Sequence, residues 1–168
     1  MPPVDPAFLK ETPIFGSLPE QVLSRLVASI RVVRTDAGAQ IFAEGDAARC
    51  MFLVAEGELE VCKRGRNGAD FCLAVLGRGA CVGEMSLIDI QARSATVRAL
   101  RPTLLYVLNQ AEIAKLYETD LEVYALLISN IAREISRRLR CADQVLVDLG
   151  VAVQGLWTND AGTKTSAL

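Results

Sequence analysis

Regularly spaced glycines are the feature that most limits what this chain can fold into. Between residues 32 and 108, short apolar and β-branched runs are separated by glycine at positions 38, 45, 57, 65, 68, 77, 79 and 83. Glycine turns between such runs are typical of short antiparallel strands. This many short strands favours a closed barrel or roll. We therefore predict a β-roll over residues 32–109.

Six segments of this region are predicted to be strands: 40–43, 50–56, 58–63, 71–76, 94–99 and 103–109. Residues 6–31, before the roll, carry two helical patterns separated by Pro13 and Gly16. The second pattern is preceded by Ser17 and Glu20, which have the spacing of a capping box. These N-terminal helices are expected to pack against the roll.

After Asn109 the pattern becomes helical, with segments predicted over 111–118 and 121–149. The longer segment has an apolar stripe at three- and four-residue steps, formed by Ile128, Ile131, Ile135, Leu139, Ala142, Leu146 and Leu149. The stripe either packs on the roll or contacts a partner. Both can hold, with one part of the helix packing on the roll and another part contacting the partner. Residues 1–150 are thus predicted to be one domain and 151–168 a flexible tail.

Length and charge limit the class of protein. A chain of 168 residues can bury one well-formed core. Its apolar runs are all shorter than the roughly 20 residues of a membrane-spanning helix, and its N-terminus does not resemble a secretory signal, so we expect a cytoplasmic protein without a membrane partner. The formal net charge of −2 and the pI near 5.3 argue against a polyanion as the main ligand.

The chain contains no histidine, which excludes histidine-dependent zinc sites, catalytic triads and the commonest general base near neutral pH. Five cysteines stand at positions 50, 62, 72, 81 and 141, without the close spacing of common metal sites. We interpret them as reduced thiols in core or strand positions. The sequence therefore predicts neither a metal site nor an enzyme.

The segment GEMSLIDIQARSATVRA, residues 83–99, carries the residues with the clearest chemistry. It places the carboxylate of Glu84 and the guanidinium of Arg93 at the two ends of a short apolar turn. A cyclic nucleotide needs a cation for its phosphate and an acceptor for its ribose hydroxyl, and these two residues offer both. Taken alone, the pair favours an ordinary surface ion pair that closes a turn, and only the surrounding motif reverses that interpretation.

Residues 8–149 resemble the cyclic-nucleotide-binding domain family, to which the catabolite activator and the protein kinase A regulatory subunit belong. The resemblance rests on three ordered motifs: DAGAQIFAEGD at 36–46, MFLVAEGELEV at 51–61 and GRGACVGEMSLIDIQARSATVRA at 77–99. It implies a mostly β fold with flanking helices (α+β). The expected core is an antiparallel β-roll of the jelly-roll type (a double-stranded β-helix), with N-terminal helices and a long C-terminal helix.

The resemblance also assigns roles within the third motif. It implies that a short helix begins near Gly83 and that Arg93 binds the cyclic phosphate together with backbone amides near Met85 and Ser86. Glycine at position 83 would let the backbone approach the ligand. Glu84 would then bind the ribose 2′-hydroxyl. Ser94 can donate its hydroxyl to phosphate or base and favours cAMP, with cGMP as the alternative.

The purine is expected against apolar side chains, for which the candidates are Val61, Phe71, Leu73 and Val82, with Ala95 completing the predicted ligand-binding set. Taken individually, each candidate is interpreted first as an ordinary core residue. The C-terminal helix is expected to cover the base. Ala142 and Asp143 stand where catabolite-activator relatives have a polar pair, so contacts from this helix are left open.

These features predict a cyclic-nucleotide sensor that signals through its C-terminal helices to a partner protein or to a second copy, by dimerisation through 121–149. One alternative is an interaction scaffold that no longer uses a ligand. Another is a catabolite-activator-type regulator without its DNA-binding part, because about 19 residues follow Leu149 and a helix-turn-helix module is longer. A basic cluster near Glu134 is expected to be solvated or partner-facing, so we expect no nucleic-acid partner; it comprises Arg133, Arg137, Arg138 and Arg140.

Overall fold

The computed structural model describes residues 3–89 and 91–161. The chain falls into two compact units, Met1–Ile131 and Ala132–Leu168. The first unit contains the strands and the candidate site. The described part of the second unit belongs to one long helix, and the domain boundary near residue 150 stays a prediction.

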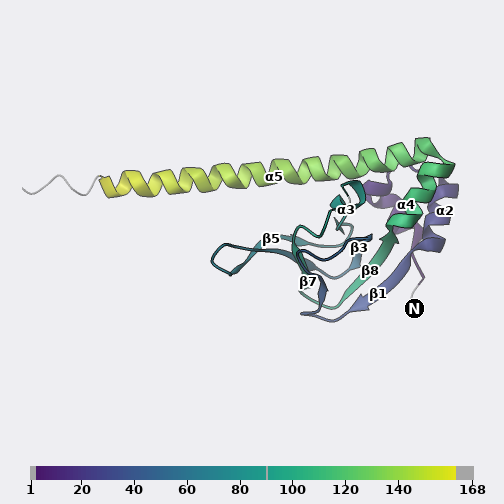
Figure 1. Cartoon of the computed structure of the whole chain (residues 1–168), viewed down its shortest axis with the longest axis horizontal. Helices are drawn as coiled ribbons and strands as arrows, with labels where there is room; N and C mark the ends of the chain where they lie inside the picture. The colour runs from purple at the N-terminus through teal and green to yellow at the C-terminus, as the bar shows by residue number, and fades with distance from the viewer. Residues whose placement is uncertain (1–2, 90, 162–168) are drawn as a thin grey trace, which may run out of the picture. The chain divides into compact units, whose positions relative to one another are not determined.

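Within the described residues, eight strands form two four-stranded antiparallel sheets (Figure 1). The first sheet has the order β1-β8-β3-β6 and the second the order β2-β7-β4-β5. The strands are β1 (Arg31–Thr35), β2 (Gln40–Phe42), β3 (Cys50–Glu56), β4 (Leu59–Arg64), β5 (Asp70–Leu76), β6 (Cys81–Val82), β7 (Thr96–Ala99) and β8 (Thr103–Asn109). The predicted mostly β fold with flanking helices is confirmed, and all six predicted strands are present.

Apolar side chains from both sheets form one core. Val54, Val82 and Leu105 come from the first sheet. Phe42, Leu59, Val97 and Ala99 come from the second sheet. Burying one large aliphatic side chain stabilises a fold by about 1.5–3 kcal/mol. This shared core holds the two sheets face to face and fixes the loops at their edges.

Short helices precede the roll: α1 (Pro6–Glu11), the 3-10 turn η1 (Pro13–Phe15) and α2 (Glu20–Ser29). The side chain of Asp5 caps α1 by accepting a hydrogen bond from Ala7 N at 2.9 Å. The capping box predicted at Ser17 is wrong. Pro19 occupies the N-cap of α2, and Ser17 has a φ of 63°, in the left-handed region.

Two helices follow the roll, α4 (Gln110–Thr119) and α5 (Leu121–Ala161), while the short α3 (Met85–Ile88) lies between β6 and β7. In the first unit, α5 buries Val123, Leu127 and Ile131. Asn130 of the same segment donates hydrogen bonds to the carbonyl oxygens of Ile14 and Gly16 at 3.3 and 2.9 Å. The beginning of α5 is thus fixed to the turn around η1.

Helix α5 continues through residues 151–161, where the sequence predicts a flexible tail, whereas 162–168 lie outside the described residues. Gly150 interrupts the pattern, but one glycine costs a helix only about 1 kcal/mol relative to alanine, too little to end it. In the second unit, Leu139, Leu146 and Leu149 are exposed. No helix in the described part of the chain is both long and apolar enough to cross a membrane.

The basic cluster of the second unit is tied to an acidic side chain. The Glu134 carboxylate accepts hydrogen bonds from Arg137 at 2.8 Å and from Arg138 at 3.1 Å. Burial by itself would raise the pKa of Glu134, but the two arginines outweigh burial and lower it. The pairing offsets part of the positive charge of this cluster, and the absence of a nucleic-acid partner stays a prediction.

Candidate functional site

The site begins at a glycine turn between strand β6 and helix α3. Gly83 has a φ of 78°, in the left-handed region where side-chain-bearing residues are strained. A Cβ atom at this position would also overlap the guanidinium of Arg93. Glycine at position 83 therefore allows both the turn and the close approach of the arginine.

Arg93 is held by the loop between β2 and β3. Its backbone N–H donates to the Asp46 carbonyl and its own carbonyl accepts from the Gly45 N–H, both at 2.9 Å. The side chain is 6% exposed. Nη1 donates to Gly83 O at 3.1 Å and to Ser86 Oγ at 3.0 Å, and Nη2 donates to Cys50 O at 2.7 Å. The arginine thus links the turn at Gly83 and helix α3 to strand β3.

The charge of this buried arginine is solvated by neutral groups, because the acceptors just named are two carbonyls and a hydroxyl. Its face lies over two aromatic rings, with Cζ 4.2 Å from the centroid of Phe42 and 5.8 Å from that of Phe52. Among residues 3–89 and 91–161, Nε has no hydrogen-bond partner. Because buried charges in proteins are normally paired, this environment favours an anion.

Glu84 lies directly after the glycine turn and is 3% exposed. It is the N-cap residue of α3, so its buried carboxylate and the turn that holds Arg93 belong to the same short segment. The N–H groups of Met85 and Ser86 belong to the first turn of α3, where helical N–H groups have no acceptor within the helix. The Ser86 hydroxyl also donates to Gly83 O at 2.8 Å.

Ser94 and Met85 form the exposed edge of the site. The Ser94 hydroxyl donates to Met85 Sδ at 3.9 Å, and both residues are exposed. The Ser94 carbonyl accepts a hydrogen bond from Lys63 Nζ at 2.8 Å. Ala95 is buried next to them. The structure therefore brings together the predicted residues from Gly83 to Ser86 and from Arg93 to Ala95.

The predicted base contacts divide into two groups. Val82 belongs to the core and Val61 packs against that core. Phe71 and Leu73 are 54% and 61% exposed on β5, which is the edge strand of its sheet. Their interpretation as core residues is therefore wrong, because the structure places both side chains on the surface.

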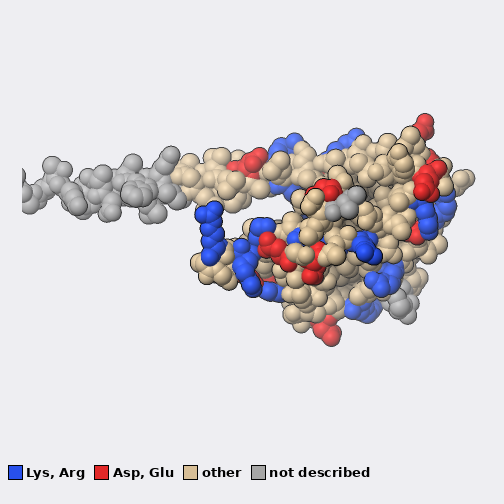
Figure 2. All heavy atoms as spheres, viewed as in Figure 1, with Lys and Arg blue, Asp and Glu red and all other residues tan. Residues whose placement is uncertain are grey.

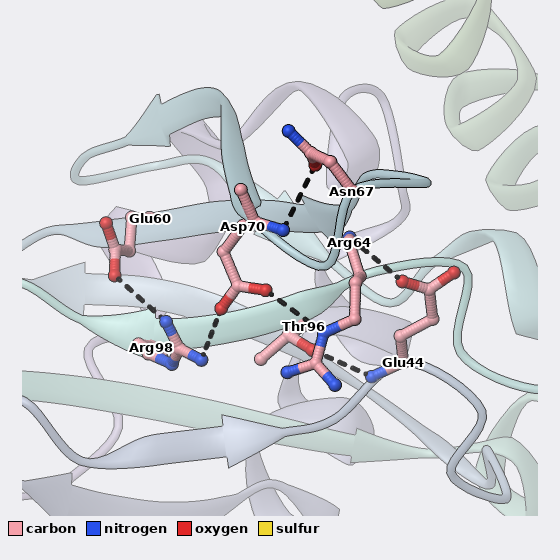
Figure 3. A network of polar contacts seen from close by, with 8 residues as sticks. Glu44, Glu60, Arg64, Asn67, Asp70, Thr96 and Arg98 are labelled. Carbon is pink, nitrogen blue, oxygen red and sulfur yellow. Dashed lines mark hydrogen bonds and ion pairs between the residues drawn. The ribbon is translucent and has the colours of Figure 1, made fainter.

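A separate network of polar side chains lies across β4, β5 and β7 (Figure 3). Arg98 donates to Asp70 at 2.9 Å and lies 4.0 Å from Glu60. The hydrogen bond from Arg98 lowers the pKa of Asp70. On the face of the roll seen in Figure 2, basic and acidic side chains are interspersed. This arrangement contrasts with the buried arginine of the turn.

The sequence reasoning missed three residues around Arg93: Phe42, Cys50 and Phe52. They lie on β2 and β3, more than 40 positions before the arginine. Phe42 and Phe52 stand within the first two family-like motifs, so the sequence did mark them as part of the family pattern. Assigning them to Arg93 also required knowing which strands pair and which side of the sheet each ring occupies.

Comparison with known proteins identifies relatives of the whole roll. The chain is 31% identical over 135 residues to the cyclic AMP receptor protein of Thermus thermophilus, covering 80% of this chain and 61% of that protein. It thus spans less than two thirds of that relative. A cyclic nucleotide-binding domain from Methylobacillus flagellatus is 25% identical with a TM-score of 0.76, covering 84% of this chain and 80% of the other.

The regulatory domain of Toxoplasma gondii PKA, solved with cAMP, is 26% identical with a TM-score of 0.63, covering 66% of this chain and 42% of that one. A family model described as the cyclic nucleotide-binding domain matches residues 32–120, which include both sheets apart from the first residue of β1. This chain therefore belongs to the cyclic nucleotide-binding domain family.

Proposed function

We propose that this chain is a sensor that binds a cyclic nucleotide at the turn between Gly83 and Arg93. The observation that carries the proposal is the buried guanidinium of Arg93, whose Nε has no partner within the described residues. A cyclic phosphate carries one negative charge and several acceptor oxygens. It would supply the anion that this environment favours.

In the proposed complex, Arg93 exchanges neutral acceptors for phosphate oxygens. A hydrogen bond to a charged group contributes about 1.5–3 kcal/mol, more than a bond between neutral groups. The N–H groups of Met85 and Ser86 supply further donors from the first turn of α3. The phosphate thus binds where the side chain is already held by the backbone of Gly45 and Asp46.

Glu84 is proposed to accept a hydrogen bond from the ribose 2′-hydroxyl. A carboxylate this close to a phosphate would otherwise be repulsive, so its burial in the same turn argues for a hydroxyl donor in the ligand. The site would consequently distinguish ribose from deoxyribose.

We propose cAMP as the preferred ligand, with cGMP as the competitor. Two relatives support this choice: the cyclic AMP receptor protein of Thermus thermophilus and the Toxoplasma gondii domain solved with cAMP. Ser94 is exposed at the edge of the turn, and its hydroxyl is proposed to contact the ligand. Val61, Phe71, Leu73 and Val82 remain the proposed apolar surface for the base.

The proposed output is regulatory, since the matched family model is that of a binding domain. The signal would pass through the C-terminal helices to a partner protein or a second copy. Cytoplasmic location and the absence of a nucleic-acid partner remain predictions from the sequence.

Thermal melting with cAMP, cGMP and a cyclic dinucleotide tests this proposal. A ligand at 100 times its dissociation constant stabilises the fold by about 2.7 kcal/mol, so a clear rise in melting temperature is expected with cAMP. A larger rise with cGMP would overturn only the choice of base. No rise with any cyclic nucleotide would favour the ligand-independent scaffold instead.

A further inference from the structure

Two cysteines that are ten positions apart in the sequence face each other across a strand pair. In the antiparallel ladder of β4 and β5, Cys62 is the direct partner of Cys72. Glu60 lies two positions before Cys62 on β4. One ligand atom from each of these three residues, a carboxylate oxygen and two sulfurs, lies within 4.8 Å of the other two.

Burial gives this trio an inner and an outer side. Cys62 is 4% exposed, Glu60 is half-buried and Cys72 is exposed. The Cys72 thiol is held on its strand by a hydrogen bond that it donates to Ala74 O at 3.6 Å. An ion could therefore reach the trio from the solvent side of Cys72 while its inner ligand is shielded.

The carboxylate of Glu60 gives the trio an anionic ligand beside the two sulfurs. The neighbouring guanidinium of Arg98 is engaged by Asp70 at 2.9 Å and reaches Glu60 only at 4.0 Å (Figure 3). A second positive charge beside Glu60 would stabilise both the carboxylate and the thiolates.

We propose that Glu60, Cys62 and Cys72 form a binding site for a thiophilic divalent cation of the zinc class, with water as the fourth ligand. Two thiolates and one carboxylate are a donor set that zinc accepts in tetrahedral geometry. Zinc–sulfur bonds of about 2.3 Å place the two sulfurs about 3.8 Å apart, which side-chain rotation can reach from the present spacing. Each thiol loses its proton to solvent as the ion binds.

The site is independent of the proposed nucleotide function, because it uses none of the residues assigned to phosphate, ribose or base. A disulfide between the same cysteines is the competing interpretation. A disulfide would consume both thiolates that bind a metal, so cobalt binding by the reduced chain and peroxide cross-linking separate the two interpretations.

Cobalt(II) titration of the reduced, metal-free full chain tests the proposal. Binding at two thiolates is expected to produce a sulfur-to-cobalt charge-transfer absorption that saturates at one ion per chain and disappears when zinc is added. Cys72→Ser should abolish this absorption. The matched control is Cys141→Ser, which also removes one exposed thiol but on α5, and should leave the absorption unchanged.

Glu60→Gln provides a second variant that keeps both thiols, and it should weaken cobalt binding by at least about tenfold while the absorption remains. Circular dichroism of each variant checks that the roll is folded. The proposal is overturned if the parent shows no absorption or if Cys72→Ser retains it. It is equally overturned if peroxide links the two cysteines while the reduced protein binds no cobalt.

Discussion

The turn from Gly83 to Arg93 and the strand β5 are both predicted to contact the ligand, yet they are built differently. In the turn, Glu84, Ser86 and Arg93 are buried, and the arginine is positioned by six hydrogen bonds to or from its backbone and guanidinium. On β5, Phe71 and Leu73 are more than half exposed. The proposed phosphate half is therefore already held in place by the protein, whereas the two β5 residues of the proposed base half are surface side chains.

This difference indicates how binding free energy is divided. Groups already held in position lose little conformational entropy when a ligand arrives, so their interactions contribute nearly in full. Exposed side chains on an edge strand contribute mainly the apolar area that a base covers. We therefore expect affinity to depend chiefly on the turn and the choice of base to depend on the weaker half.

Removing the guanidinium is expected to have the largest effect. Arg93→Ala should weaken cAMP binding by about a hundredfold or more, because it deletes charge-assisted hydrogen bonds from a buried site. Equilibrium titration with a fluorescent cAMP analogue measures this loss. Arg101→Ala, which removes an exposed arginine paired with Glu58, is the control and should bind as the parent does. Equal affinity in Arg93→Ala would remove the site assignment.

The glycine turn offers a matched pair of variants. Gly83 and Gly79 have φ values of 78° and 83°, so alanine at either position strains the backbone by about 1 kcal/mol or more. The new Cβ at Gly83 meets Arg93, whereas the space around Gly79 is open. Gly83→Ala should therefore lose at least tenfold in cAMP affinity, and Gly79→Ala should lose stability alone. Equal losses of affinity would show that backbone strain explains both.

Glu84 is tested with ligands that differ at one hydroxyl. The parent should bind cAMP about tenfold more tightly than 2′-deoxy-cAMP, because the deoxy ligand leaves a buried acceptor without its donor. In Glu84→Gln this preference should shrink to about threefold or less. Competition titrations with both ligands measure the two ratios. An unchanged preference in the variant would contradict the ribose role.

The base half is expected to respond more weakly. Leu73→Ala should reduce cAMP affinity by about three- to tenfold while changing the free energy of unfolding by no more than about 0.5 kcal/mol, because the side chain is exposed. Leu76→Ala is the control: Leu76 packs against the core, so its truncation should lower stability clearly. Titration and urea unfolding of both variants separate the effects. A Leu73→Ala variant that keeps full affinity would remove this residue from the site.

The smallest effect is expected in the outer polar network. The Arg98 hydrogen bond lowers the pKa of Asp70 in the fold, so its stabilising contribution is present above the unfolded value near 3.8 and is lost as pH falls through the folded pKa. Urea unfolding should show Asp70→Asn slightly less stable than the parent at pH 7. The difference should vanish in acid, and a difference that grew on acidification would contradict the assignment.

Much of the roll could be predicted because glycine turns and apolar runs are local signals. Strand β1 was missed because its RVVRT sequence follows α2 without a glycine, and β6 has only two residues. The long helix was predicted too short because glycine was interpreted as an end signal. In the site, the roles proposed for Gly83, Glu84 and Arg93 rest on one contiguous motif and on its resemblance to the family.

Other features depend on pairing between distant segments. The rings of Phe42 and Phe52 reach Arg93 only because β2 and β3 flank the turn in the folded roll. Cys62 and Cys72 become neighbours only through the register of β4 and β5, which spacing along the chain does not reveal. The exposure of Phe71 and Leu73 likewise follows from β5 being an edge strand.

Calorimetric titration of the full chain with cAMP tests the central claim most directly. The titration is made at two temperatures, because a binding enthalpy of zero at one temperature would hide the reaction. We expect saturable binding of one cAMP per chain. Heat-free titrations at both temperatures, with protein shown to be folded, would contradict the proposal that the turn around Arg93 binds a cyclic nucleotide.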